Sequence, residues 1–207
     1  MAFYISLILK LLCVIVLYLL VIRPRTLTWG ATHQEVLYRL TGNDIVKKPH
    51  FNATRAVTIN APSNEIWKWI IQIGTARAGW YSIDWIDNKG VPSSNEIIPE
   101  FQKIEEGYFI PFTPNQKNGM WVKEYIENEY ILWWDKKGNF TWGWFLKQTK
   151  NNQTRLLTRI RIRYNFSFHR ILFYILTDIG DIIMMRKCML GIKERAENNF
   201  RKIKSVK

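Results

Sequence analysis

Residues 155–164 read RLLTRIRIRY, and this stretch decides the class of fold. Every second position carries an apolar side chain or a threonine, and most positions between them carry arginine. A period of two is typical of a β-strand with one buried face and one face toward water. Because antiparallel sheets commonly leave one face solvated, the stretch predicts a half-buried antiparallel strand with a basic outer face.

Shorter strands precede it. The pattern predicts them over residues 107–112, 120–126, 130–135 and 140–145, which are separated by turn-forming residues. Upstream, residues 55–60 alternate as a strand, and residues 62–73 follow as a helix with isoleucines on one face. A loop-rich stretch over 80–102 joins this helix to the later strands.

The last predicted element is a long helix over residues 169–202. Apolar side chains recur on it at helical spacing, at Ile175, Ile179, Ile182, Ile183, Met185 and Met189. Its charged residues exclude a second membrane span. This order of elements predicts an α+β, helix-grip fold, in which a curved antiparallel sheet wraps around the C-terminal helix and leaves a cavity between them.

Phe3 to Ile22 is an apolar run with one charge, Lys10, and with neither Pro nor Gly. Its length suits a bilayer, and it lacks the basic start and cleavage site of a signal peptide, so we predict an uncleaved transmembrane helix. Lys10 either reaches the nearer interface or faces a partner helix. Arg23 and Arg25 follow the run, which by the positive-inside rule predicts a single-pass protein of the cell membrane with its domain in the cytoplasm.

The region after this run is predicted to connect the membrane to the folded domain. Thr32 and Glu35 have the spacing of a capping box, which predicts a short amphipathic helix over 32–41. A polar connector follows over 43–52. The predicted divisions are an anchor with its flank (1–25), the helix and connector (26–52), the folded domain (53–203) and a basic tail (204–207).

The net charge of +13 lies at the two ends of the chain, and residues 146–207 alone hold 15 bases and 4 acids. Nucleic-acid binding would need clustered bases with exposed stacking aromatics in a recognisable module, which the sequence lacks, so we predict no nucleic-acid partner. Two interpretations of the basic segment remain. It is a solvated face, or it is attracted to anionic lipid, where each Lys or Arg contributes about 1 kcal/mol.

The sequence offers little reactive chemistry. Two cysteines and three scattered histidines form no CxxC pair and no Cys/His cluster, so neither a disulfide scaffold nor a metal site is predicted. The chain also lacks a Gly-x-Ser-x-Gly motif and a Gly-rich phosphate loop. We therefore expect no cofactor and no nucleophilic catalysis.

Several segments resemble a known superfamily. They read WGAT (29–32), ATRAVTI (53–59), IWKW (66–69), QIG (72–74), RAGWYSIDWIDN (77–88) and MLGIKERAE (189–197). The chain is similar over 29–203 to the SRPBCC (START-like, helix-grip) superfamily, and most to its bacterial polyketide cyclase/dehydrase-like subgroup. The resemblance implies a sheet that grips the C-terminal helix around a deep hydrophobic cavity. Such proteins bind lipids, sterols, polyketides or other apolar small molecules, and a minority are enzymes.

Ten tryptophans supply the aromatic surface for such a cavity. The predicted ligand-binding residues are Trp80, Tyr81, Asp84, Trp85, Trp121, Trp142, Trp144, Met185 and Met189. The tryptophans and methionines have an alternative interpretation as plain core packing. The polar residues of the 77–88 loop, among them Arg77, either orient a ligand and move protons or simply hold the loop in place.

Three functions follow from these patterns. The first is a membrane-anchored domain that binds an apolar small molecule or lipid between sheet and helix. The second is a cyclase/dehydrase-type enzyme acting in the same cavity, which would need Asp84, Tyr81 or Arg77 to point into it. The third is an interaction module with a filled core and no ligand.

Overall fold

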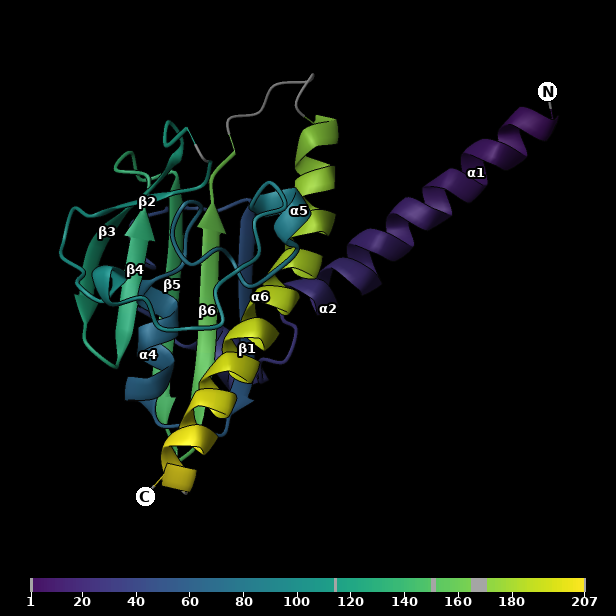
Figure 1. Cartoon of the computed structure of the whole chain (residues 1–207). Coiled ribbons are helices and arrows are strands. Elements are labelled where there is room, and N and C mark those ends of the chain that lie inside the picture. The colour runs from purple at the N-terminus through teal and green to yellow at the C-terminus, as the bar shows by residue number, and fades with distance from the viewer. Residues whose placement is uncertain (1, 114, 150–151, 165–170, 207) are drawn as a thin grey trace.

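The computed structural model describes residues 2–113, 115–149, 152–164 and 171–206. It consists of a sheet-and-helix body and a long N-terminal helix that projects away from it (Figure 1). The body is a curved, six-stranded, fully antiparallel sheet with the long C-terminal helix across one face. The predicted α+β fold class is confirmed.

The sheet has the strand order β1-β6-β5-β4-β3-β2. Its strands are β1 (Phe51–Ile59), β2 (Phe109–Pro111), β3 (Gly119–Ile126), β4 (Tyr130–Trp134), β5 (Phe140–Gln148) and β6 (Thr154–Ile162). Each predicted strand is present. β1 begins at Phe51, before the predicted start at Arg55. Asn52 was expected in the connector because its side chain is polar, but it is an exposed residue of the strand.

The helices of the body differ more from expectation. They are α3 (His33–Leu37), α4 (Ser63–Ile71), α5 (Asp84–Asp87), the 3-10 turn η2 (Pro99–Phe101) and α6 (Ile171–Val206). The predicted start of the last helix at His169 lies outside the described residues. α3 has the predicted capping box, in which Thr32 Oγ1 accepts from the Glu35 amide at 3.2 Å and Glu35 Oε2 accepts from the Thr32 amide at 2.7 Å. It ends at Leu37, four residues earlier than predicted.

α4 and α6 cover the inner face of the sheet, where the core lies (Figure 1). Met185, Met189 and Ile192 of α6 are buried there. Ile179 and Ile183, which the sequence placed on the same apolar face, are instead 42% and 56% exposed. At about 100° per residue they lie roughly 120° or more around the helix from the buried row, so the predicted face was too wide.

The outer face of β6 is not the solvated basic face that the sequence predicted. Residues 30–46, which we call the strap, lie over it, and Arg159 is only 5% exposed. All five guanidinium N–H groups of Arg159 have acceptors on the strap or on β1. These are Thr54 Oγ1 (2.8 Å), the carbonyls of Glu35 (2.9 Å), Val36 (2.8 Å) and Tyr38 (2.6 Å), and Asn43 Oδ1 (3.3 Å). Burial among these neutral groups lowers the pKa of Arg159 to about 10.

Two neighbouring arginines hold the strap in the same way. Arg155 forms an ion pair with Glu35 at 2.8 Å and also donates to the Gly30 carbonyl at 2.5 Å. Arg161 donates to the Val46 carbonyl at 3.1 Å. The arginine side chains on the outer face of β6 are therefore hydrogen-bonded to the strap. The segment predicted as a connector packs on the sheet as a layer of the fold.

The Arg155–Glu35 contact makes the fold sensitive to acid. The hydrogen bond from Arg155 lowers the pKa of Glu35 from 4.5 to about 2, so the contact stabilises fully above about pH 4.5 and is lost as the pH falls toward 2. We expect Glu35→Gln to remove this pH dependence and to cost on the order of 1–2 kcal/mol near pH 7. Urea unfolding of the full chain near pH 7 and near pH 3 measures both effects. A stability difference between the two proteins that does not shrink at the lower pH would contradict the assignment.

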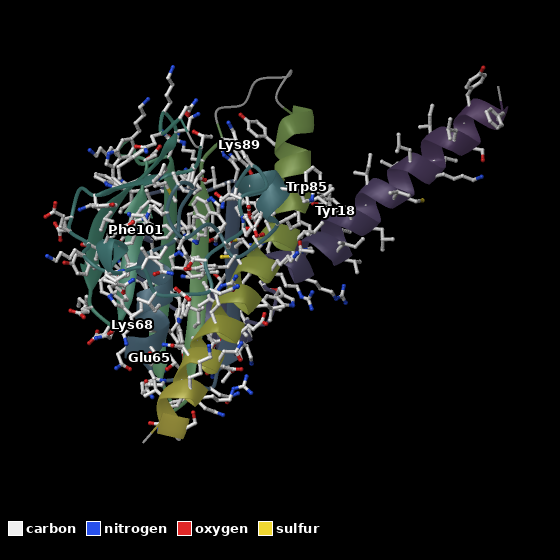
Figure 2. The ribbon with its side chains drawn as sticks, in the orientation of Figure 1. Tyr18, Glu65, Lys68, Trp85, Lys89 and Phe101 are labelled. Carbon is white, nitrogen blue, oxygen red and sulfur yellow. The ribbon has the colours of Figure 1, made fainter. Side chains whose placement is uncertain are left out.

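The N-terminal helix runs continuously through α1 (Ala2–Leu17), the π-helical turn η1 (Tyr18–Ile22) and α2 (Arg23–Leu27). Phe3–Leu27 is long and apolar enough to cross a membrane, and within the described residues it is the one helix that meets this test. On the N-terminal side of Tyr18, the side chains of this helix are exposed all around it (Figure 2). The predicted apolar run is thus helical, and the helix continues for five residues beyond the predicted end at Ile22.

We call the continuous helix formed by α1, η1 and α2 the anchor helix, after the role predicted for it, and it contacts the body near its C-terminal end. Asp178 of α6 accepts from Tyr18 Oη at 2.8 Å and from Arg23 Nε at 2.6 Å. Asp178 is only 8% exposed, so this ion pair is well shielded from water. The contact fixes α6 beside the end of the apolar span.

Candidate ligand site

Four tryptophans from three segments meet between the sheet and α6, and we call them the indole cluster. Trp142 and Trp144 project inward from β5, Trp133 from β4, and Trp80 from the loop before α5. Trp80 stacks on Trp142 with ring centres 5.8 Å apart, and Trp142 lies 5.3 Å from both Trp133 and Trp144. Strand alternation explains the set, because these strand positions are in phase with the buried face.

The four indole N–H groups have unequal partners. Trp80 Nε1 donates to Thr75 Oγ1 and Trp142 Nε1 donates to Thr158 Oγ1, each at 2.8 Å. Trp133 and Trp144 are fully buried, and their Nε1 atoms have no acceptor among the described residues. Leaving a donor unpaired in the interior costs about 1–3 kcal/mol, so two on neighbouring strands call for an explanation.

The structure brings together six of the nine predicted ligand-binding residues. Trp80, Tyr81, Trp142, Trp144, Met185 and Met189 all belong to the buried core between sheet and α6. Trp85 does not, because it points outward from α5 and is 77% exposed (Figure 2). Trp121 lies on the other face of β3 from the buried Met120 and Val122, against Phe109.

Asp84, the remaining predicted residue, holds its own loop. Its two carboxylate oxygens accept from the Ser93 amide at 3.0 Å and from the Ser93 hydroxyl at 2.5 Å. Tyr81 is similarly engaged, because its hydroxyl accepts from Gln72 at 2.8 Å and donates to the Trp69 carbonyl at 3.2 Å. Burial raises the pKa of Tyr81 above its ordinary value of 10, so its hydroxyl stays protonated.

Arg77 also serves the loop. It donates to the carbonyls of Ile71 at 2.7 Å and Ile73 at 3.2 Å, and its guanidinium lies over the rings of Phe101 and Tyr108. Each polar residue that a cyclase/dehydrase-type enzyme would use is therefore hydrogen-bonded to neighbouring residues.

Sequence reasoning left Trp133 and Thr158 out of the site. Both had a usable signal, because Trp133 is in phase with buried Ile131 on β4 and Thr158 is in phase with the apolar positions of β6. The partnership of Thr158 with Trp142 is different, since it joins residues on adjacent strands and depends on their register. Only the sheet pairing reveals it.

A buried charge also lies on this inner face and was not predicted. Arg55 of β1 is 1% exposed, and its Nη1 lies 2.6 Å from Asp181 Oδ2 of α6. Its Nε donates to the Thr26 carbonyl at 2.9 Å, so one side chain joins the sheet, α6 and the end of the anchor helix. Burial raises the pKa of Asp181 above its ordinary value of 3.8 even though Arg55 opposes the shift.

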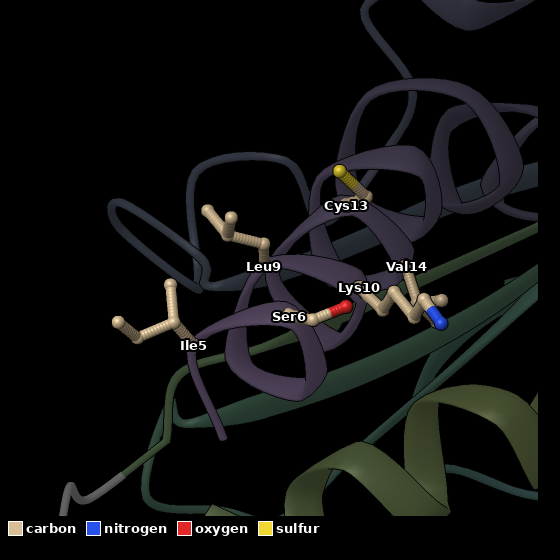
Figure 3. Close-up of a pocket in the computed structure, with 6 residues that line it drawn as sticks. All are labelled: Ile5, Ser6, Leu9, Lys10, Cys13 and Val14. Atoms are coloured by element: carbon tan, nitrogen blue, oxygen red, sulfur yellow. The ribbon is translucent and has the colours of Figure 1, made fainter. Parts of the chain in front are cut away.

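Two hollows lie away from the indole cluster. One runs along the anchor helix and is lined by Ile5, Ser6, Leu9, Lys10, Cys13 and Val14 (Figure 3). Its open side would face lipid in a membrane-inserted helix. The other, of about 280 Å³, lies between the end of the anchor helix and α6, and is lined by Val21, Ile22, Arg25, Thr26, Trp29 and Ile182.

Comparison with known proteins gives structural likenesses only. No family model matches the chain, and no curated protein sequence matches it. Among solved structures, EF2215 of Enterococcus faecalis, a conserved protein of unknown function, is similar with a TM-score of 0.47 and 16% identity, covering 78% of this chain and 90% of that one. NE0264 of Nitrosomonas europaea is similar with a TM-score of 0.45 and 12% identity, covering 72% and 95%. DynU16, from the dynemicin biosynthetic locus, is similar with a TM-score of 0.39 and 12% identity, covering 68% and 46%.

Proposed function

We propose that this protein is a membrane-anchored domain that binds an apolar molecule carrying a hydrogen-bond acceptor between its sheet and α6. The observation that carries the proposal is the pair of indole N–H groups at Trp133 and Trp144, which have no acceptor in the part of the chain that the structure describes. Small-molecule sites are mostly apolar and aromatic, with a few polar groups that fix orientation. The indole cluster has this composition, and the resemblance to the SRPBCC superfamily points to the same class of ligand.

The hydrogen bonds within the 77–88 loop favour ligand binding over catalysis. Arg77, Tyr81 and Asp84 are the groups an enzyme of the cyclase/dehydrase type would need, and each bonds to nearby backbone or side chains. A group held this way supports the walls of a site rather than transferring protons within it. The proposed ligand is an apolar small molecule or a lipid.

The proposed location is the cell membrane, with the domain on the cytoplasmic side. Support comes from the apolar helix Phe3–Leu27 and from the two arginines, Arg23 and Arg25, toward its body-proximal end. A domain tethered in this way would meet membrane-derived molecules at high local concentration. This arrangement suits a lipid or a lipid-like ligand.

The test compares ligand retention by matched variants of the full chain. Wild type, Trp133→Phe/Trp144→Phe and Trp85→Phe are purified in detergent, and bound compounds are identified by native mass spectrometry and solvent extraction. Phenylalanine keeps an aromatic ring but lacks the N–H. Because each lost hydrogen bond is worth about 1 kcal/mol, we expect roughly tenfold or greater loss of a bound compound in the double variant.

Trp85→Phe is the matched control, since Trp85 is exposed and outside the cluster. Lipid held only by the anchor helix should be equal in all three proteins, so it does not mimic the expected result. Equal retention of every compound by the three proteins would refute the proposal.

A second candidate, an interaction module without a ligand, is favoured by one observation. Trp133, Trp144 and Met189 have no exposed surface, and the indole rings are in mutual contact, as in a filled core. The same experiment separates the two functions. A core of this kind retains no specific compound, whereas the proposed ligand site does.

A further inference from the structure

The hollow between the end of the anchor helix and α6 has features of a lipid site, and we call it the junction groove. Its apolar wall consists of Val21 and Ile22 from the anchor helix, Ile182 from α6 and the ring of Trp29. Val21 and Ile22 belong to the apolar span itself. If the span crosses a bilayer, the junction groove lies where acyl chains meet headgroups, the depth at which tryptophan is enriched.

Two guanidinium groups that form no ion pair with any residue the structure describes border the junction groove. Arg25 is exposed beside it, and its Nη1 donates to the Val21 carbonyl at 2.9 Å, which holds the guanidinium near the end of the span. Arg186 of α6 is also exposed, and its guanidinium lies 5.4 Å from the centre of the Trp29 ring. The two guanidinium groups therefore flank the groove from the two helices that form it.

The nearby acids are already paired. Asp178 bonds to Arg23, and Asp181 lies against Arg55. The net field at the junction groove is therefore positive, which complements a phosphate. Free phosphate would contact only the two arginines. A phospholipid would contact the arginines with its phosphate and also cover the apolar wall with its acyl chain.

The exposed isoleucines of α6 extend the same surface. Ile179 and Ile183 are 42% and 56% exposed next to Ile182, whereas Met185, Met189 and Ile192 of the same helix are buried in the core. Apolar side chains on a helix that lies at an interface are buried in the headgroup region. This placement explains why α6 keeps an apolar exposed surface at its membrane-proximal end.

We propose that the junction groove binds one acidic phospholipid of the bilayer that the anchor helix crosses. Arg25 and Arg186 contact its phosphate, and Val21, Ile22 and Ile182 pack on the upper part of its acyl chain. The inference rests on the proposed membrane insertion and is independent of the ligand in the indole cluster. It assigns α6 a second role, in which one end packs on the sheet and the other end lies on the lipid surface.

The test uses the full chain in lipid nanodiscs. In a Cys13→Ser background, where the remaining Cys188 is buried, Ile183→Cys carries an environment-sensitive fluorophore. Acyl-brominated phosphatidylglycerol or acyl-brominated phosphatidylcholine is then added as a minor component of a phosphatidylcholine bilayer. Since two arginines favour anionic lipid, we expect the brominated acidic lipid to be enriched roughly tenfold over the neutral one at the fluorophore, as judged by quenching.

Arg25→Gln/Arg186→Gln should abolish this preference, while Arg201→Gln, an exposed arginine at the far end of α6, should keep it. A fluorophore at Ile203→Cys should not be quenched by either lipid. Equal quenching by the two lipids at position 183, or a preference that survives the double substitution, would overturn the proposal. Extraction of the chain from membranes by alkaline carbonate would instead refute the membrane insertion on which it rests.

Discussion

Replacing Arg159 with methionine is expected to destabilise the folded chain by roughly 3–5 kcal/mol. The substitution keeps an unbranched apolar side chain but removes all five donors, three of which satisfy carbonyls near the end of α3. The bond to the Glu35 carbonyl is buried and the other two are partly buried, and these carbonyls have no alternative donors within the helix, as is usual for the last carbonyls of a helix. Urea unfolding of the full chain in detergent micelles, followed by tryptophan fluorescence, measures the loss.

The strap should also open in this variant before the sheet unfolds. Amide hydrogen exchange over residues 30–46 should become faster, while β5 and the indole cluster stay protected. Arg163→Met is the matched control, because Arg163 follows β6 and is exposed, and it should change stability by less than about 0.5 kcal/mol. Similar losses in the two variants would show that Arg159 does not hold the strap.

Arg55→Leu is expected to cost about 3 kcal/mol for a different reason, since it leaves the partly buried Asp181 carboxylate without its counter-charge. The variant also removes the donor to the Thr26 carbonyl at the end of the anchor helix. Unfolding of the full chain in urea measures this cost. The partner variant Arg55→Leu/Asp181→Leu should recover most of it, because two apolar side chains of similar size carry no unpaired charge.

The loss in Arg55→Leu should shrink in acid. Burial already raises the pKa of Asp181 above 3.8, so the folded state binds the proton more tightly than the unfolded state does. The stability of the variant therefore rises as the pH falls through the folded pKa of Asp181, and the gain is complete below the unfolded pKa. A penalty that is independent of pH, or one that the double variant fails to relieve, would contradict the importance of the ion pair.

Local patterns were sufficient for the strands and for the main helices. The alternation over 155–164 specified β6, and the spacing of Thr32 and Glu35 specified the cap of α3, because both depend on neighbours within a few residues. The apolar run from Phe3 specified the anchor helix for the same reason. Trp142 and Trp144 followed from their phase on β5.

Contacts between distant segments were not encoded in such patterns. The arginines of β6 read as a solvated face, and only the docking of the strap more than 100 residues upstream shows that Arg159 is buried. Trp85 and Trp121 looked like their buried counterparts, and their place outside the indole cluster depends on loop geometry and strand phase in three dimensions. The Arg55–Asp181 pair likewise joins two elements that the sequence describes separately.

The sequence by itself thus determined an α+β domain on an apolar N-terminal helix, since periodicity and run length report which faces leave water. The tertiary structure decided where the excess charge goes. Of the basic residues near the C-terminal end, Arg155, Arg159 and Arg161 hold the strap, while Arg186 borders the junction groove. The physical reason is that an arginine has five donors and finds its partners by proximity in space, which spacing along the chain does not record.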